Sequence, residues 1–411
     1  MKNLIFSPAD FCLTPYAVND PAWTKWAVIA CDQFTSEPAY WEEASRFVGN
    51  TPSALRLILP EAYLESEREE EHKQIIASTM PMLDKALRTW ENSMLYLERT
   101  LPDGRIRRGL VGKIDLEAYD YSVGSTSAVR ATEATVLERI PPRVAIRSAA
   151  AYELPHVMVL MDDTVGLFSH LIEQRGAYTP LYDFPLMQGG GHAAGWRVSG
   201  DALEALAEKI ASYEASRAGG LVYAMGDGNH SLASARAHYQ NLKEKLGECV
   251  LTHPARWALV EMVALDDPAL DFEPIYRVVT DCDPADFLSA LDAVTQNGSA
   301  GAQRVTIVTA AEKREISFTA PTHALTVGTL QEFIDAYITA HPGVKCDYIH
   351  DEASLCALAS RAGCVGFLFD GMAKEELFPY VLAHGTLPRK TFSMGEARSK
   401  RYYIEARKIV K

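Results

Sequence analysis

The feature that most constrains the fold is a hydrophobic segment that ends in two glycines and passes directly into a helical pattern. Residues 221–225, Leu-Val-Tyr-Ala-Met, have the length and composition of a buried β-strand. Gly226 and Gly228 follow, and glycine allows a sharp turn and close approach of a ligand to the backbone. Apolar residues then recur at helical spacing as far as Leu246. The sequence therefore predicts a strand, a glycine turn and an amphipathic helix.

The start of this helix predicts a site for an anion. We expect Asp227 or Asn229 to be the N-cap, because both residue types are preferred there. First-turn N–H groups have no partner within the helix, and the helix dipole favours negative charge at that end. The predicted phosphate cradle consists of Gly226, Gly228, Asn229 and Ser231. His230 adds a side chain that titrates near neutral pH. The alternative is a capped turn in which His230 is only hydrogen-bonded.

Residues 227–231, Asp-Gly-Asn-His-Ser, resemble the D-G-H-H-R signature of the domain of unknown function 1015 family. The resemblance extends along nearly the whole chain, through residues 28–36, 130–143, 272–279 and 387–396. Two positions depart from the family pattern. Ser231 stands where the signature has arginine, which removes a cation able to pair with phosphate, and Tyr276 stands where relatives often have histidine. Roles tied to these two positions are therefore in doubt.

The D-G-x-H element is also similar to one in the ParB/sulfiredoxin superfamily, where such a turn and helix N-terminus hold nucleotide phosphates. That superfamily includes kinases that phosphorylate free serine. The resemblance implies a ParB/sulfiredoxin-like element around residues 221–246. It also implies ATP or ADP as a ligand, together with Mg²⁺, for which Asp227 is the candidate ligand.

Composition excludes several classes of protein. Lysine and arginine number 40 against 54 aspartate and glutamate residues, so the formal net charge is −14 and disfavours general nucleic-acid binding. Seven cysteines without C-x-x-C spacing predict neither a disulfide framework nor a zinc site. No apolar run approaches the roughly 20 residues of a membrane span. We expect a cytoplasmic protein that binds a small anionic ligand or nucleotide, and neither nucleic acid nor a membrane.

Strand-like and helix-like patterns alternate along the chain. This alternation predicts an α/β or mixed α+β protein with mixed sheets flanked by helices. Strands are expected at residues 27–31 and 157–161, and helices within residues 61–98. Asp103-Gly104 predicts a hairpin turn.

A glycine- and serine-containing segment at residues 297–301 is the best candidate for a linker. It predicts a main α/β domain over residues 1–296, which carries the D-G-N-H-S motif. A smaller α+β part is predicted over residues 303–411. Its segment 387–396 is a candidate for folding back onto the first part.

Cationic side chains in two further segments are candidates for phosphate binding, because guanidinium and ammonium groups bind phosphate oxygens. The cationic candidates are Arg130, Arg139, Arg389 and Lys390, and the neighbouring Thr391 is a further candidate. Glu133 is a candidate to accept a proton from a substrate hydroxyl. The alternatives are a structural salt-bridge network for the first segment and a solubilising surface for the second.

Three residues are candidates for contact with the substrate. Asp32 and Gln33 directly follow a predicted strand, where loops of α/β proteins often place functional side chains. His192 follows three glycines at residues 189–191, which would allow the loop to move as a lid. A turn-forming aspartate and a plain flexible loop are the alternatives.

Two functions are compatible with these features. The first is a nucleotide-dependent phosphotransferase that acts on a small hydroxylated metabolite, with free serine as a candidate. Its catalytic residues would be Asp227, His230 and Glu133. The second is a non-catalytic regulatory protein that binds a nucleotide or phosphometabolite. Turnover distinguishes them, because a regulatory protein releases no product.

Overall fold

The computed structural model describes residues 4–64, 66–298 and 303–411, and these residues form two compact units. The first contains the described residues up to Leu270, together with residues 381–385 and 396–411. The second contains Asp271–Tyr380 and residues 386–395. The chain therefore enters the second unit well before residue 296, and its last residues belong to the first unit.

The predicted linker at residues 297–301 does not coincide with this division. Asn297 ends the strand β16 (Thr295–Asn297), which pairs with β18 (Lys313–Phe318) inside the second unit. The backbone at Asn297 is therefore part of a sheet, although the local composition is typical of a linker. Residues 299–301 of the predicted linker lie outside the described residues.

The first unit is built around a large mixed β-sheet, which confirms the predicted fold class. Across the sheet the strands are β6 (Tyr119–Asp120), β7 (Val129–Arg130), β12 (Tyr223–Asp227), β9 (Met158–Met161), β13 (Trp257–Ala264), β5 (Ile106–Asp115), β4 (Arg88–Thr100), β2 (Ala9–Leu13), β23 (Ala406–Lys408) and β8 (Tyr152–Glu153). β1 (Phe6–Ser7) pairs with β5. The strands β10 (Thr179–Pro185) and β11 (His192–Val198) form a hairpin, and β11 also pairs with β4. A separate two-stranded sheet joins β3 (Val28–Ile29) to β22 (Tyr402–Tyr403).

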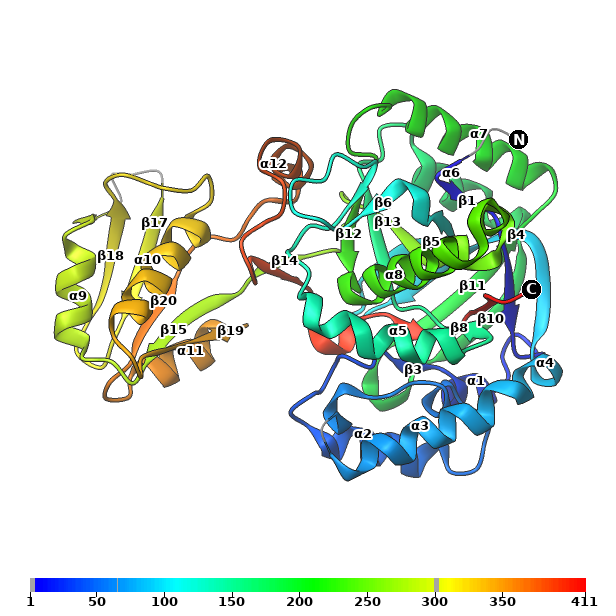
Figure 1. The fold of residues 1–411 in the computed structure, drawn as a ribbon, viewed down its shortest axis with the longest axis horizontal. Helices are drawn as coiled ribbons and strands as arrows, with labels where there is room; N and C mark the ends of the chain where they lie inside the picture. Colours follow the sequence, from blue (N-terminus) through cyan, green and yellow to red (C-terminus); the bar gives the residue numbers. More distant parts are fainter. Residues whose placement is uncertain (1–3, 65, 299–302) are drawn as a thin grey trace. The chain divides into compact units, whose positions relative to one another are not determined.

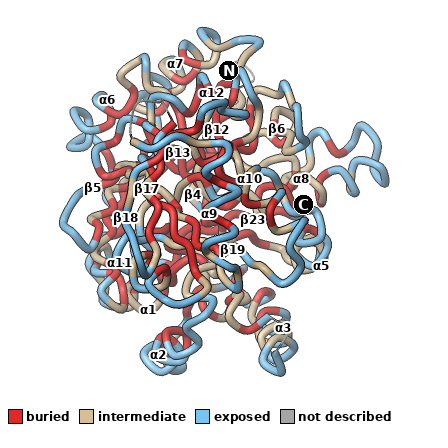
Figure 2. Tube along the Cα trace, turned by 90° about the vertical axis from the view of Figure 1, so that its left-hand side faces the viewer, coloured by how far each residue is buried: buried red, intermediate tan, exposed pale blue. Residues whose placement is uncertain are grey.

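Helices flank this sheet. They are α1 (Ala22–Trp26), α2 (Pro38–Val48), α3 (Glu67–Thr79), α4 (Leu83–Ala86), α5 (Ile140–Ala149), α6 (Leu167–Gln174), α7 (Asp201–Ser216) and α8 (Asn229–Leu246). α5 and α8 lie beside each other along the unit (Figure 1). Strands β12 and β13 and the second half of β4 are mostly buried, whereas much of α3 is exposed (Figure 2). No helix in the described part of the chain combines the length and apolar character of a membrane span.

One predicted helical stretch is partly wrong. Residues 61–98 do contain α3 and α4, but β4 begins at Arg88 and continues to Thr100. Residues 88–93 of β4 pair with β2, and its later residues pair with β5 and β11. These cross-strand contacts outweigh the local helical pattern. The hairpin turn at Asp103-Gly104 between β4 and β5 is confirmed, with Gly104 in a positive-φ conformation.

The second unit has its own antiparallel sheet and core. Its strand order is β16, β18, β17 (Arg304–Val308), β20 (Val365–Leu368), β15 (Tyr276–Thr280) and β19 (Lys345–Ile349). β14 (Phe272–Pro274) pairs separately with β21 (Phe392–Met394). Its helices are α9 (Pro284–Asp292), α10 (Thr326–Ala340) and α11 (Glu352–Ala359), and α12 (Leu377–His384) contains the boundary between the units. Phe287, Ile334 and Phe367 belong to its buried core.

Candidate functional site

The glycine turn between β12 and α8 has the architecture predicted from the sequence, but a different cap. Gly228 is the N-cap of α8, with φ at 79° in the left-handed region. The prediction of Asp227 or Asn229 as N-cap was therefore wrong. The physical reason is the positive φ, which glycine adopts without steric cost and other residues rarely adopt. The packing face of α8 is confirmed by the buried Leu232, Ala235 and Tyr239.

Gly228→Ala should lower the free energy of unfolding by roughly 1–3 kcal/mol, because an alanine there has strained φ. Its Cβ would also lie 3.0 Å from Cα of Val157, which is backbone and cannot swing away. Gly176→Ala is the matched control, because that glycine has no atom within 4 Å of an added Cβ and no positive φ. Urea unfolding of both variants measures the difference. Equal stability of Gly228→Ala and the control would contradict the steric argument.

Asp227 is held at the end of β12 by two contacts. Its Oδ1 accepts a hydrogen bond from the N–H of Gly228 at 2.9 Å. Its Oδ2 lies 3.4 Å from Nζ of Lys400, whose side chain is largely buried. Lys400 comes from the C-terminal segment that returns to the first unit. The carboxylate is thus fixed beside a lysine, at the start of an 18-residue helix.

His156 connects the first turn of α8 to the loop after β3. Its Nε2 lies 3.5 Å from Oγ of Ser231 and 3.6 Å from Oδ2 of Asp32. Its Nδ1 lies 2.8 Å from the hydroxyl of Tyr403. His156 and Tyr403 are both buried, whereas the Asp32 side chain is 31% exposed. We call Asp32, His156, Asp227, Ser231 and Lys400 the polar cluster.

The carboxyl of Asp32 is kept ionised by its neighbours. Burial alone would raise its pKa, but His156, a hydrogen bond from Gln33 and the charge of Lys400 together hold the pKa below its ordinary value of 3.8. Gln33 donates to Oδ1 of Asp32 at 3.0 Å. Burial and the neighbouring Asp32 raise the pKa of the Cys31 thiol to about 12. Cys31 is therefore a thiol at neutral pH and a poor nucleophile.

The first turn of α8 contains polar groups that other protein atoms do not satisfy. Gly228 has no side chain to cap the helix. The side-chain oxygen of Asn229 is buried and has no hydrogen-bond partner within the described residues. His230 is engaged, since its Nε2 accepts from the N–H of Val136 at 3.4 Å. Asn229 and Ser231 thus belong to a helix start without a side-chain cap.

Glu133 follows the strand β7, which runs parallel to β12. Both strands therefore end at the same edge of the sheet, and the hydroxyl of Thr132 donates to the carbonyl of Met225 at 2.8 Å. This topology places the segment of Glu133 next to the end of β12.

The two arginines of the same region make different contacts. Arg130 is buried, and its guanidinium donates to the carbonyls of Thr126 and Ser127 at 3.1 and 2.7 Å. Arg139 is exposed, and its carbonyl accepts a bond from Arg143. Neither guanidinium has a contact with the polar cluster among those that the described residues show.

The predicted basic pair at residues 389–390 belongs to the second unit. Arg389 forms an ion pair with Asp335 at 2.6 Å. The carbonyl of Lys390 accepts a bond from the buried Arg277 at 3.1 Å, and the hydroxyl of Thr391 donates to the carbonyl of Pro388 at 2.7 Å. These residues stabilise the loop of the second unit.

His192 lies at the start of β11, where its Nε2 is 3.0 Å from Oδ1 of Asp183. The glycines before it are tightly packed. A Cβ on Gly190 would meet the hydroxyl of Tyr402, and one on Gly191 would meet the carbonyl of Thr100. Close packing explains why Gly190 and Gly191 are glycines, so neither residue requires a moving lid as its explanation.

At the sequence level, His156 and Tyr403 were missed as site candidates, and Lys400 was not selected from the basic segment 387–401. His156 directly precedes a predicted strand, which was a usable signal. Lys400 lies in the basic C-terminal segment, at the opposite end from Arg389 and Lys390. Tyr403 carries no sequence signal, because its role depends on the pairing of β22 with β3.

The proposed Mg²⁺ ligand Asp227 does not form a ready metal site. Over the described residues, no group of three or more histidine, cysteine, aspartate and glutamate side chains is arranged to hold a metal ion. Both oxygens of Asp227 are already engaged, by the Gly228 N–H and by Lys400. The residues therefore do not fit a preformed Mg²⁺ site.

Comparisons with solved structures find chains that align with most of this chain. A conserved hypothetical protein from Pyrococcus furiosus matches at 11% identity, covering 71% of this chain and 90% of that one, with a TM-score of 0.35. C-terminally truncated SbnI from Staphylococcus aureus matches at 10% identity over 71% and 85%, with a TM-score of 0.39. A free serine kinase in complex with AMP matches at 9% identity over 72% and 90%, with a TM-score of 0.37. Alignments at this level transfer no residue role to this chain.

A comparison with curated proteins finds no match. A family model matches residues 13–337, which is most of the chain and includes the whole strand–turn–helix element with the D-G-N-H-S motif. The match confirms the family resemblance of the sequence motifs. The chain belongs to the family described as "Protein of unknown function (DUF1015)".

Proposed function

We propose that this protein is a nucleotide-dependent phosphotransferase that acts on a small hydroxylated metabolite, with free serine as a candidate acceptor. The observation that supports it is the polar cluster. It joins an ionised carboxylate (Asp32), a lysine (Lys400) and a histidine (His156) to the start of a long helix. Phosphoryl transfer depends mainly on positioning and on neutralising charge, and these groups supply both.

The phosphoryl donor is placed at the helix start in this proposal. The dipole of α8 favours an anion there, and the helix lacks a side-chain cap at Gly228. Lys400 lies within 3.4 Å of Asp227 and can exchange part of this contact for a phosphate oxygen. Gly226 and Gly228 add no side chain of their own to the turn, and Gly228 is buried against Val157 and His156.

The acceptor is placed beside Asp32. The cluster holds two carboxylates against one lysine, so it favours a hydroxyl or an ammonium group at this position over a second anion. In the transfer step the acceptor oxygen forms a bond to the terminal phosphorus of the nucleotide. The bond from phosphorus to the bridging oxygen breaks, and its electron pair leaves with the shortened nucleotide. The hydroxyl proton passes to the carboxylate of Asp32.

His156 is a positioning residue in this scheme, because it touches Asp32, Ser231 and Tyr403 and thereby fixes the carboxylate relative to α8. His230 and Glu133 remain predictions for proton transfer at the same edge of the sheet. No step is assigned to Mg²⁺, because the residues do not form its site.

A thermal-shift and turnover assay with ATP and ADP, each with and without serine, tests the proposal. A nucleotide at 100 times its dissociation constant should stabilise the protein by about 2.7 kcal/mol. Lys400→Met should remove most of this stabilisation, because it removes the cation beside the helix start. Lys408→Met is the matched control, since that exposed lysine pairs with Asp84 instead.

The possible outcomes separate the functions. Stabilisation together with formation of a phosphorylated acceptor supports the phosphotransferase. Binding without product for any acceptor would instead favour the regulatory nucleotide-binding protein. Absence of binding, or an equal loss in Lys400→Met and Lys408→Met, would reject the proposed site.

A further inference from the structure

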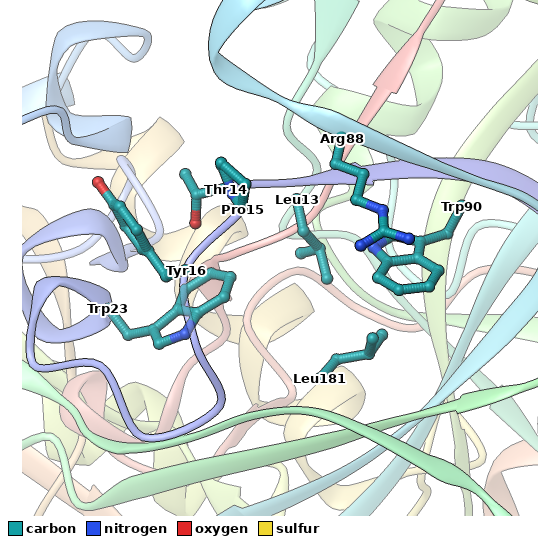
Figure 3. Close-up of a pocket in the computed structure, with 8 residues that line it drawn as sticks. All are labelled: Leu13, Thr14, Pro15, Tyr16, Trp23, Arg88, Trp90 and Leu181. Atoms are coloured by element: carbon teal, nitrogen blue, oxygen red, sulfur yellow. The ribbon is translucent and has the colours of Figure 1, made fainter.

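A cavity lies in the first unit, and none of its lining residues belongs to the polar cluster. Its volume is about 80 Å³, several times the roughly 10–15 Å³ that one water molecule needs. The residues that line it include Leu13, Thr14, Trp23, Arg88, Trp90 and Leu181 (Figure 3). They come from the end of β2, from α1, from the start of β4 and from β10.

Part of the wall of this cavity is apolar, and the rest carries polar atoms. Leu13, Trp23 and Leu181 are all buried. The indole N–H of Trp23 already donates to the carbonyl of Ala17 at 2.9 Å, so it offers no further hydrogen bond to a ligand. The part of the wall formed by Leu13, Trp23 and Leu181 therefore fits a hydrocarbon group.

Thr14 supplies an unsatisfied polar group at this wall. The residue is 5% exposed, and its Oγ1 is buried without a hydrogen-bond partner within the described residues. Figure 3 shows this hydroxyl on the side of Thr14 that faces Trp23. Burying a hydroxyl without a partner is unfavourable, and a ligand atom that accepts its hydrogen bond would remove that cost.

Arg88 supplies a cation at the edge of the cavity. Its guanidinium lies 4.1 Å from the centroid of the Trp90 ring, and this stacking fixes the orientation of the group. Arg88 is exposed and has no ion pair in the part of the chain that the structure describes. A stacked guanidinium keeps its N–H donors free for a carboxylate, which it binds through two parallel hydrogen bonds.

We propose that this cavity binds a small carboxylate with an apolar tail, such as a branched-chain or phenyl-substituted carboxylic acid. The tail lies against Leu13, Trp23 and Leu181, and the carboxylate pairs with Arg88. The hydroxyl of Thr14 donates to an oxygen of the ligand. This site is separate from the proposed phosphotransferase chemistry and does not depend on it.

Calorimetric titration of the full chain with 4-methylpentanoate, 3-phenylpropionate and the neutral 4-methylpentanamide tests the site. The acids should bind saturably, and the amide should bind roughly tenfold more weakly because it lacks the charge. Arg88→Met should weaken binding of the acids by a similar factor and leave the amide unaffected. Arg175→Met is the matched control, since that guanidinium stacks on Trp196 outside the cavity.

Thr14→Val supplies an independent measurement. It should weaken binding of the acids roughly three- to tenfold. It should also leave the melting temperature of the free protein unchanged or higher, because the buried hydroxyl has no partner to lose. Three results would overturn the proposal: no saturable binding of either acid, equal binding of acid and amide, or unchanged affinity in both Arg88→Met and Thr14→Val.

Discussion

Arg401→Met should destabilise the first unit by roughly 3–5 kcal/mol, because it leaves the buried Glu405 without its cation and the buried Glu261 with only Arg107, at 3.9 Å. Arg401 is 2% exposed, and its guanidinium lies 2.7 Å from Glu261 and 2.7 Å from Glu405. Both carboxylates are fully buried, and Tyr182 donates a further hydrogen bond to Glu405 at 2.6 Å. Urea unfolding followed by tyrosine and tryptophan fluorescence measures the loss.

The loss of stability in Arg401→Met should arise from the unpaired charge of the buried carboxylates. A double variant distinguishes this cause from lost packing. Arg401→Met combined with Glu405→Gln should recover part of the stability, since one buried charge is removed with the other. Arg68→Met is the control: its ion pair with Glu42 is exposed and should contribute at most about 1 kcal/mol. A loss in Arg401→Met no larger than in the control would contradict the prediction.

This buried network lies next to Lys400, the residue of the polar cluster that comes from the C-terminal segment. Arg107 donates to the carbonyl of Ser399 at 2.8 Å, and Arg99 donates to that of Arg398 at 3.1 Å. Lys400 therefore follows two residues whose carbonyls are hydrogen-bonded, Arg398 and Ser399, and precedes the buried Arg401. A rigid backbone on both sides fixes the ammonium group relative to Asp227, which favours a preorganised site.

The local elements of the site could be predicted from the sequence because their signals are local. A strand, a glycine turn and a helix follow one another within residues 221–246, and the structure contains all three in this order. The cap was mispredicted, since residue preference alone does not report the backbone conformation of Gly228. The strand character of residues 88–93, the first part of β4, was missed because it depends on pairing with β2, which is distant in sequence.

The partners of the motif could not be predicted, because they come from distant segments. Lys400 lies about 170 residues after Asp227, and the sequence offered several basic positions without a way to choose among them. The division into units decides between them: residues 386–395 belong to the second unit, whereas residues 396–411 belong to the first. His156 reaches Asp32 through the fold of the sheet, for which spacing in the sequence gives no indication.

Asp32→Asn should reduce the rate of phosphoryl transfer by roughly 10²–10⁴-fold, because the variant cannot accept the proton of the acceptor hydroxyl. The loss should appear mainly in kcat, since the amide has the size of the carboxylate and keeps one of its two acceptor oxygens. In the wild type, burial is outweighed by His156, Gln33 and Lys400, and the pKa of Asp32 lies below 3.8. Asp32 should therefore remain ionised throughout the neutral and mildly acidic range.

Two measurements separate this catalytic role from a structural one. The first is the pH profile: protonation of Asp32 should cause no loss of activity as the pH falls from neutral to about 5, since its pKa lies below 3.8. The second is the pair of variants Asp32→Asn and Asp286→Asn. Asp286 also lies near a histidine, 3.5 Å from His341, but in the second unit, so its replacement should leave turnover unchanged. If Asp32→Asn folds normally and retains the wild-type rate, Asp32 is not the proton acceptor, and His230→Ala and Glu133→Gln become the variants that test the two remaining candidates.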